Sequence, residues 1–187
     1  MSGKSGLTSG HHIPLLGFCA HSSGAGKTTL LARLIPALTS RGLRVSIIKH
    51  AHHSFDIDHP GKDSYRLRQA GAVQTLLGSS KRWALMTELA NTAEPQLEEL
   101  ASHIDPMLTD LILVEGFKQA SIAKIEIHRP NLGKPLLADT DPNIIAVASD
   151  ETVTTSLPLL NLNNAEEVAG FVLRWLRQEV QPPQLVQ

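Results

Sequence analysis

The stretch His21-Ser22-Ser23-Gly24-Ala25-Gly26-Lys27-Thr28-Thr29 decides the fold of this chain. It lies between an apolar run over residues 13–20 and a segment that we expect to be helical from Lys27 to about Ser40. In such a strand–loop–helix unit, successive backbone N–H groups and the positive end of the helix dipole converge on one point. The stretch therefore predicts a loop that holds the phosphates of a nucleotide.

Eight residues of this loop are predicted to hold the nucleotide: Ser22, Ser23, Gly24, Ala25, Gly26, Lys27, Thr28 and Thr29. We expect Lys27 to reach the β- and γ-phosphates, where it also serves catalysis, and the hydroxyl of Thr28 to bind Mg²⁺. His21 stands where the pattern G-x-x-x-x-G-K-[ST] has its first glycine, and a side chain there restricts how the chain can turn. The alternative is a small-residue connector that binds no ligand.

The composition is that of an ordinary globular protein, and the length favours one domain. Of the 187 residues 42% are hydrophobic, and 17 Lys and Arg balance 18 Asp and Glu to a formal net charge of −1. This balance disfavours nucleic acid or an anionic membrane as a partner. No apolar run approaches the ~18 residues of a membrane span. The single Cys19 cannot form an intramolecular disulfide, so we expect a cytoplasmic protein.

Apolar patterns predict one α/β domain over residues 13–180, with disordered tails over 1–12 and 181–187. Strands are expected over residues 15–20, 44–49, 73–77, 83–87, 111–114, 123–128, 144–148 and near 159–160. Helices are expected over 27–40 and 64–70, after Glu94-Pro95, and around 168–176. This alternation favours a mostly parallel sheet flanked by helices, as in P-loop NTPases. Isoleucines alternate with charged residues over 123–128, which predicts a half-exposed strand there.

A carboxylate that could meet Mg²⁺ is Glu115, which directly follows the apolar run over 111–114. In parallel sheets, ligands sit beyond the carboxyl ends of strands, so Glu115 belongs at the phosphate edge. Its rival Asp110 starts the same strand and would lie about 16 Å away at ~3.3 Å per residue. We expect Glu115 to hold Mg²⁺ or to orient the attacking water. The alternative is a carboxylate that only accepts hydrogen bonds from loop N–H groups.

Two further acids, Asp56 and Asp58, lie in the polar loop that follows the strand over 44–49. This loop starts from the same edge of the sheet, and acidic loops near Mg²⁺ and phosphate can become ordered when the γ-phosphate arrives. We predict catalytic roles for Asp56 and Asp58, with Asp56 also a magnesium ligand. The alternative is that both aspartates only form turns in a solvated loop.

The same loop region carries His50, His52, His53 and His59, which raises the hypothesis of a transition-metal site. However, no cysteine lies nearby, and the His-x-His-His spacing matches no structural zinc site. Loop histidines beside a triphosphate are the simpler interpretation.

Asp150 ends the strand over 144–148, at the position where this architecture commonly meets a purine base. A carboxylate accepts hydrogen bonds from N1–H and the 2-amino group of guanine, and adenine offers no such pair of donors. Asp150 therefore favours GTP over ATP. The sequence Ala148-Ser149-Asp150 differs from the Asn-Lys-x-Asp signature of most GTPases.

Several motifs together resemble the molybdopterin-guanine dinucleotide biosynthesis protein B (MobB) family, over about residues 13–178. They are Ile48-Lys49-His50, His52-His53, Asp56-x-Asp58, the run from Pro60 to Ser64, Arg82 to Met86, the run from Asp110 to Lys118, and Ile145 to Asp150. The resemblance implies a homodimeric GTP-binding protein with weak GTPase activity and Mg²⁺ as cofactor. It also implies a role beside the guanylyltransferase MobA, which attaches GMP to molybdopterin; molybdopterin itself is a further candidate ligand.

The leading hypothesis is therefore a GTP-binding adaptor in molybdenum cofactor maturation, in which water attacks the γ-phosphate in line. Lys27 and Mg²⁺ would neutralise charge, and an acid from Asp56, Asp58 or Glu115 would position the water. The sequence has no evident arginine finger, which predicts slow turnover. Two alternatives stay open. One is a small-metabolite kinase; such kinases usually have an arginine-bearing lid, whereas the arginines of this chain are scattered along the sequence. The other is a metal-delivery GTPase that uses the loop from His50 to His59.

Overall fold

The structure, a computed structural model, describes residues 13–51, 55–89 and 94–180. It divides into two compact units. The sheet unit comprises the chain up to His50 and from Leu97 onward, and the hairpin unit comprises Ala51–Gln96. The tails that we predicted over 1–12 and 181–187 lie outside the described residues.

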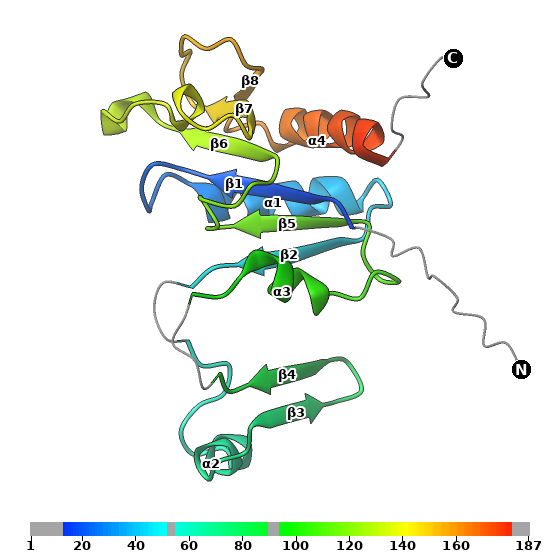
Figure 1. Ribbon diagram of the computed structural model, residues 1–187. Coiled ribbons are helices and arrows are strands. Elements are labelled where there is room, and N and C mark those ends of the chain that lie inside the picture. The colour runs from blue at the N-terminus through cyan, green and yellow to red at the C-terminus, as the bar shows by residue number, and fades with distance from the viewer. Residues whose placement is uncertain (1–12, 52–54, 90–93, 181–187) are drawn as a thin grey trace, which may run out of the picture. The chain divides into compact units, whose positions relative to one another are not determined.

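The sheet unit is built on six parallel strands in the order β2-β5-β1-β6-β7-β8 (Figure 1). Their bounds are β1 Leu15–Cys19, β2 Val45–Lys49, β5 Leu111–Glu115, β6 Lys124–His128, β7 Ile144–Ser149 and β8 Leu159–Asn161. Every residue of β5 is buried, as expected for a continuous apolar run inside a parallel sheet. The predicted α/β fold of the P-loop NTPase type is confirmed.

Helices cover both faces of this sheet (Figure 1). The helices α1 (Lys27–Thr39) and α4 (Ala165–Val180) pack on one face, where leucines at helical spacing on α1 enter the larger hydrophobic core. The short helix α3 (Leu97–Ser102) packs on the other face, against a smaller core that includes Ile112 and Val114 of β5. Among the described helices, none is both long and apolar enough to cross a membrane.

The prediction of a half-exposed strand around 123–128 is wrong, because all five residues of β6 are buried. The strand lies between β1 and β7, and the segment with the short 3-10 helices η1 (Pro130–Leu132) and η2 (Leu137–Asp139) follows it. The alternating charges are buried and paired instead of exposed. The ammonium of Lys124 lies 2.6 Å from the Asp141 carboxylate, and Glu126 accepts backbone hydrogen bonds from Leu137 and Ala138, both at 2.9 Å.

The hairpin unit contains the helix α2 (Asp63–Gln69) and the antiparallel strands β3 (Gln74–Gly78) and β4 (Trp83–Thr87). These two strands form a sheet of their own. The turn between them is held by Ser79, whose N–H donates to the Arg82 carbonyl at 2.9 Å and whose hydroxyl accepts from two turn N–H groups. Both strands and the helix were expected at these positions.

Candidate functional site

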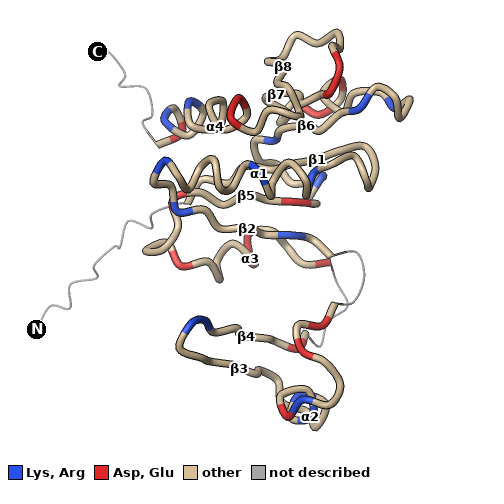
Figure 2. The backbone as a smooth tube through the Cα atoms, turned by 180° about the vertical axis from the view of Figure 1, so that it is seen from behind, with Lys and Arg blue, Asp and Glu red and all other residues tan. Residues whose placement is uncertain are grey.

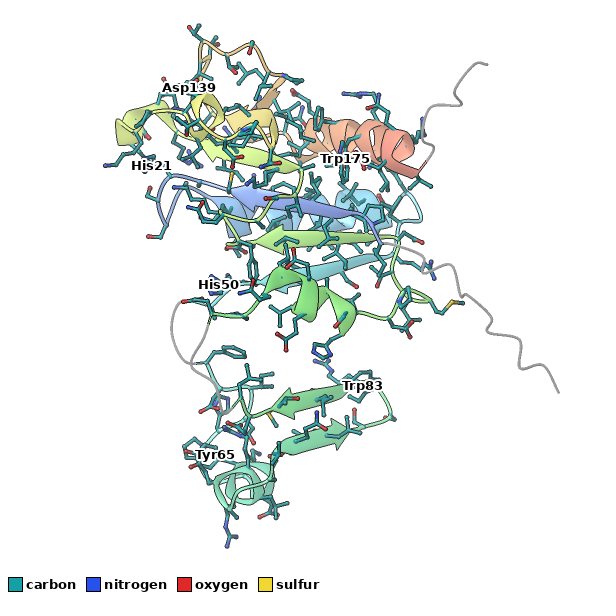
Figure 3. All side chains as sticks on the ribbon, viewed as in Figure 1. His21, His50, Tyr65, Trp83, Asp139 and Trp175 are labelled. Atoms are coloured by element: carbon teal, nitrogen blue, oxygen red, sulfur yellow. The ribbon has the colours of Figure 1, made fainter. Side chains whose placement is uncertain are left out.

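The loop between β1 and α1 has the backbone of a phosphate cradle. Gly24 and Gly26 take positive φ angles of 81° and 108°, a conformation that side chains rarely adopt, and Gly26 is the N-cap of α1. Because a glycine has no side chain, it cannot cap the first N–H groups of the helix, which leaves the cap to a ligand or to water. His21, labelled in Figure 3 beside the end of β1, is not among the residues with positive φ, so replacing the first glycine causes no backbone strain.

Lys27 is already held inside the loop. Its ammonium donates to the Ser22 carbonyl at 3.4 Å, a long hydrogen bond that folds the side chain back over the cradle. Ala25 is buried, whereas Ser23, Gly24, Thr28 and Thr29 are exposed. The predicted phosphate ligands therefore sit on one accessible turn, with one cation above them.

Three side chains meet at the edge where a magnesium ion was predicted. The Thr28 hydroxyl donates to Glu115 Oε1 at 2.8 Å, and the other carboxylate oxygen lies 3.5 Å from the Lys49 ammonium. Lys49 also reaches the Thr28 hydroxyl at 3.5 Å. In Figure 2 the acidic end of β5 and the basic end of β2 lie at the same edge of the sheet. A hydroxyl and a buried carboxylate are the hard oxygen ligands that Mg²⁺ prefers, so these residues fit the ion.

The rival carboxylate of Asp110 lies at the opposite end of β5. It accepts hydrogen bonds from the Arg44 backbone N–H at 2.8 Å and from the Arg44 Nε at 3.0 Å. The hydrogen bond from Arg44 lowers the pKa of Asp110 below its usual range. Asp110 thus holds the start of β5 to Arg44, whereas Glu115 lies beside Thr28 at the carboxyl end of the strand. The magnesium role of Glu115 stays a prediction.

Arg129 is a site residue that the sequence reasoning missed. Its Nε donates to the Ala25 carbonyl at 2.9 Å, and its Nη1 pairs with Asp150 Oδ2. The predicted base-reading residue Asp150 is thereby connected to the phosphate loop. The rule that pointed to Glu115 also marks Arg129 and Lys49 as candidates, because each lies at the carboxyl end of a strand of the parallel sheet, but it does not predict which loop or side chain each contacts.

Asp56 and Asp58 lie in the hairpin unit, where both carboxylates bind Arg68. The Arg68 Nη2 lies 2.6 Å from Asp56 Oδ1 and 2.8 Å from Asp58 Oδ1, and its Nη1 lies 3.1 Å from Glu88 Oε1. Burial opposes the ionisation of Asp58, but hydrogen bonds from Arg68 and Ser64 outweigh it and lower the pKa of Asp58. The catalytic and magnesium roles of these two aspartates stay predictions.

The two described histidines of the predicted metal loop, His50 and His59, belong to different units. His50 belongs to the sheet unit, where its ring lies 5.0 Å from the ring of Phe117, and His59 is exposed in the hairpin unit (Figure 3 labels His50). His52 and His53 lie outside the described residues. In the parts of the chain that are described, no group of three or more His, Cys, Asp or Glu side chains could hold a metal ion.

Residues 15–150 match the model of a family described as molybdopterin guanine dinucleotide synthesis protein B, MobB. A protein of Escherichia coli K12, named molybdopterin-guanine dinucleotide biosynthesis adapter protein, is 52% identical over 168 residues, which are 89% of this chain and 95% of that one. A protein of Haemophilus influenzae with the same name is 47% identical over 167 residues, 89% of this chain and 91% of that one.

Solved structures agree with these sequence matches. A crystal structure named molybdopterin-guanine biosynthesis protein B superimposes with a TM-score of 0.70 at 27% identity. The superposition covers 87% of this chain and 99% of that chain. The likeness therefore extends well beyond the phosphate loop.

Proposed function

This chain belongs to the MobB family, and from that premise we propose that it is a GTP-binding adapter with weak GTPase activity in molybdopterin-guanine dinucleotide biosynthesis. The observation that carries the proposal is the 2.8 Å hydrogen bond between Thr28 and Glu115 beside the glycine-bearing loop. It supports the proposal because a hydroxyl and a carboxylate side by side are ligands that a nucleotide-bound magnesium ion accepts.

The residues of the loop and its neighbours would bind different parts of the nucleotide and its metal ion. The N–H groups from Ser22 to Thr29 would surround the phosphate oxygens, and Lys27 would leave the Ser22 carbonyl to meet the β- and γ-phosphates. Thr28 and Glu115 would hold Mg²⁺, directly or through water. When bound, the ion supplies positive charge against the phosphates. Lys49 balances the charge of Glu115 until that ion binds.

We propose slow hydrolysis because the arginine that contacts the loop is already engaged. Arg129 is bound to the Ala25 carbonyl and to Asp150, so it is not free to neutralise charge on the γ-phosphate as an arginine finger would. Glu115 is our first candidate for orienting the attacking water. Asp56 and Asp58 are further candidates, and each would have to exchange its contact with Arg68 for the new role.

Base selection is assigned to Asp150. Its side chain is largely buried, and its Oδ1 atom is buried without a hydrogen-bond partner. An unpaired buried acceptor is unfavourable until a donor reaches it, and guanine presents two donors on its Watson–Crick edge. This supports GTP as the nucleotide.

An adapter must contact other molecules, and we propose a guanylyltransferase of the MobA type as its protein partner, molybdopterin as a further ligand and a homodimer as the working form. Apolar side chains exposed on the hairpin strands, such as Leu76, Trp83 and Leu85, offer a surface for the second copy. Trp83→Arg should weaken self-association about tenfold or more in analytical ultracentrifugation. Unchanged association would remove this surface from the proposal.

The function is tested by calorimetric titration of the full chain with GTP and ATP, with and without Mg²⁺. Lys27→Ala should weaken GTP binding about 10- to 100-fold, because a charged hydrogen-bond donor to phosphate is lost. Lys81→Ala, which removes an exposed lysine of the hairpin turn, is the matched control. Retained GTP affinity in Lys27→Ala would contradict the proposal. Repeating the titration with purified guanylyltransferase tests whether GTP strengthens the association of the two proteins.

A further inference from the structure

Arg129 contacts two parts of the sheet unit that come from different strands. It directly follows β6, and its Nε donates to the Ala25 carbonyl in the loop after β1. Its Nη1 pairs with Asp150 at the end of β7. The guanidinium also lies against Gly26, since a Cβ atom at that position would be only 3.3 Å from Nη2. One planar side chain therefore spans the phosphate loop and the base-reading carboxylate.

We propose that Arg129 is a positioning residue, which fixes the carboxylate of Asp150 relative to the phosphate loop and thereby sets the preference for guanine. This inference rests on the proposed GTP-binding function. Its physical basis is the rigid fork of the guanidinium, which binds through two nitrogens at once and so defines an orientation as well as a charge.

The two oxygens of Asp150 are in different situations. Oδ2 accepts from Arg129, and Oδ1 is buried with no hydrogen-bond partner. Without Arg129 the carboxylate could rotate and satisfy both oxygens by turning toward water. With Arg129 in place, the unpaired oxygen is kept in one direction, where a base with donors would be favoured and the acceptor N1 of adenine would be repelled.

Arg129 lies where several strand ends of the sheet unit come together. A small cavity of about 20 Å³ beside it is lined by residues from the start of α1, among them Gly26 and Thr29, and by Leu162 and Asn163 just after β8. The ends of β1, β6, β7 and β8 therefore contribute to one neighbourhood. Parallel sheets bring ligands to such strand ends.

The test measures the affinities of the full chain for GTP, ATP and xanthosine triphosphate in the presence of Mg²⁺. In Arg129→Gln, the ratio of GTP to ATP affinity should fall about tenfold, with a smaller change in ATP affinity, since only the contact with guanine depends on the orientation of Asp150. Arg129→Lys keeps the charge without the fork and should give an intermediate ratio. Arg177→Gln, an exposed arginine on α4, is the matched control.

The variant Asp150→Asn provides a second test of whether Arg129 orients the side chain at position 150. An asparagine donates to the 2-oxo group of xanthine, so this variant should prefer xanthosine triphosphate over GTP. Adding Arg129→Gln to Asp150→Asn should erode the new preference, because the amide is then no longer held in one orientation. A preference of Asp150→Asn for xanthosine triphosphate that is unaffected by Arg129→Gln would overturn the positioning role.

The effects of Arg129→Gln on affinity and melting temperature also distinguish a positioning role from an electrostatic or a purely structural role. An equal loss of GTP and ATP affinity in Arg129→Gln would mean that Arg129 acts only as a charge near phosphate, and a lower melting temperature with an unchanged ratio would mean a purely structural role. Either result overturns the inference and leaves the proposed function standing. A wild-type chain that binds none of the three nucleotides would instead remove the proposed function itself.

Discussion

The strands of the sheet unit are enclosed by helices on both faces, whereas β3 and β4 of the hairpin unit pair only with each other. Every strand position of β5 and β6 is buried. Among the described residues of the hairpin unit, by contrast, the one buried residue is Asp58, and large apolar side chains such as Trp83 are exposed. The two regions are thus held by different interactions.

The difference concerns what stabilises each region. In the sheet unit, removal of apolar surface from water is the main contribution, at roughly 1.5–3 kcal/mol for each fully buried large aliphatic side chain. In the hairpin unit the central contact is ionic, with Arg68 between Asp56, Asp58 and Glu88 and over the ring of Tyr65. Two-stranded hairpins are marginal alone, so we expect this unit to open at a lower free energy than the sheet.

The largest effect is expected from Leu34→Ala in the sheet unit. Leu34 of α1 is fully buried in the larger core, and its truncation should lower the free energy of unfolding by about 2–5 kcal/mol. Leu67→Ala, an exposed leucine of α2 in the hairpin unit, should change it by less than about 0.5 kcal/mol. Chemical denaturation measures both. Equal losses of unfolding free energy in the two variants would contradict the distinction between a sheet unit with a hydrophobic core and a hairpin unit without one.

A second large effect is expected from Arg68→Met. The substitution leaves three carboxylates without their shared cation, one of them buried, so β3 and β4 should lose most of their hydrogen-exchange protection. The strands of the sheet unit should keep theirs. Mass-spectrometric exchange resolves the two regions, with Arg66→Met, an exposed arginine of the same helix, as control. Loss of protection in β1 or β5 would show that the units unfold together.

Acid should act on the hairpin unit through Asp58. The pKa of Asp58 is lowered in the folded chain, so its contribution to stability is complete above the ordinary aspartate value of about 3.9 and is lost as pH falls through the lowered pKa. Amide resonances of β3 and β4 should therefore shift below about pH 4. In Asp58→Asn this acid transition should be absent, and its persistence there would assign it to another carboxylate.

The smallest effect is expected from Lys49→Gln. Lys49 is half exposed, so its pair with Glu115 contributes at most about 1 kcal/mol to stability, in contrast to the cluster around Arg68. Removing a cation that competes for Glu115 should lower by a few-fold the Mg²⁺ concentration needed for half-maximal GTP binding. Nucleotide titrations at several Mg²⁺ concentrations check this. An increased Mg²⁺ requirement would mean that Lys49 assists the ion.

Most of the fold was predictable because the sheet unit obeys apolar periodicity. The run over 111–114 correctly predicted the buried strand β5, and the Gly-Lys-Thr motif correctly predicted the start of α1. The strand β6 was misjudged because Lys124 and Glu126 alternate with isoleucines as exposed residues do, and their partners come from the segment after β6, whose position the sequence pattern does not predict.

The contacts of Arg129 and Lys49 were not predicted for a related reason. Arg129 and Lys49 reach the phosphate loop and Glu115 only because β6 lies beside β1 and β2 beside β5. Strand order is a property of the whole sheet and is not encoded in the pattern of any single strand. The partner of Asp58 was unpredictable for the same reason, since Arg68 is one of several arginines that could have met it.

Gly116 fixes the point at which the chain leaves the sheet unit. Its φ angle is +107°, and a Cβ atom there would lie 2.9 Å from the Cβ of His50, the last residue of that unit before the hairpin unit begins. The N–H of His50 donates to the Glu115 carbonyl at 2.8 Å. The backbone at His50, where the chain passes into the hairpin unit, is thus hydrogen-bonded to Glu115, the residue proposed to bind magnesium. Any larger residue at 116 would collide with His50 and displace its main chain from this hydrogen bond.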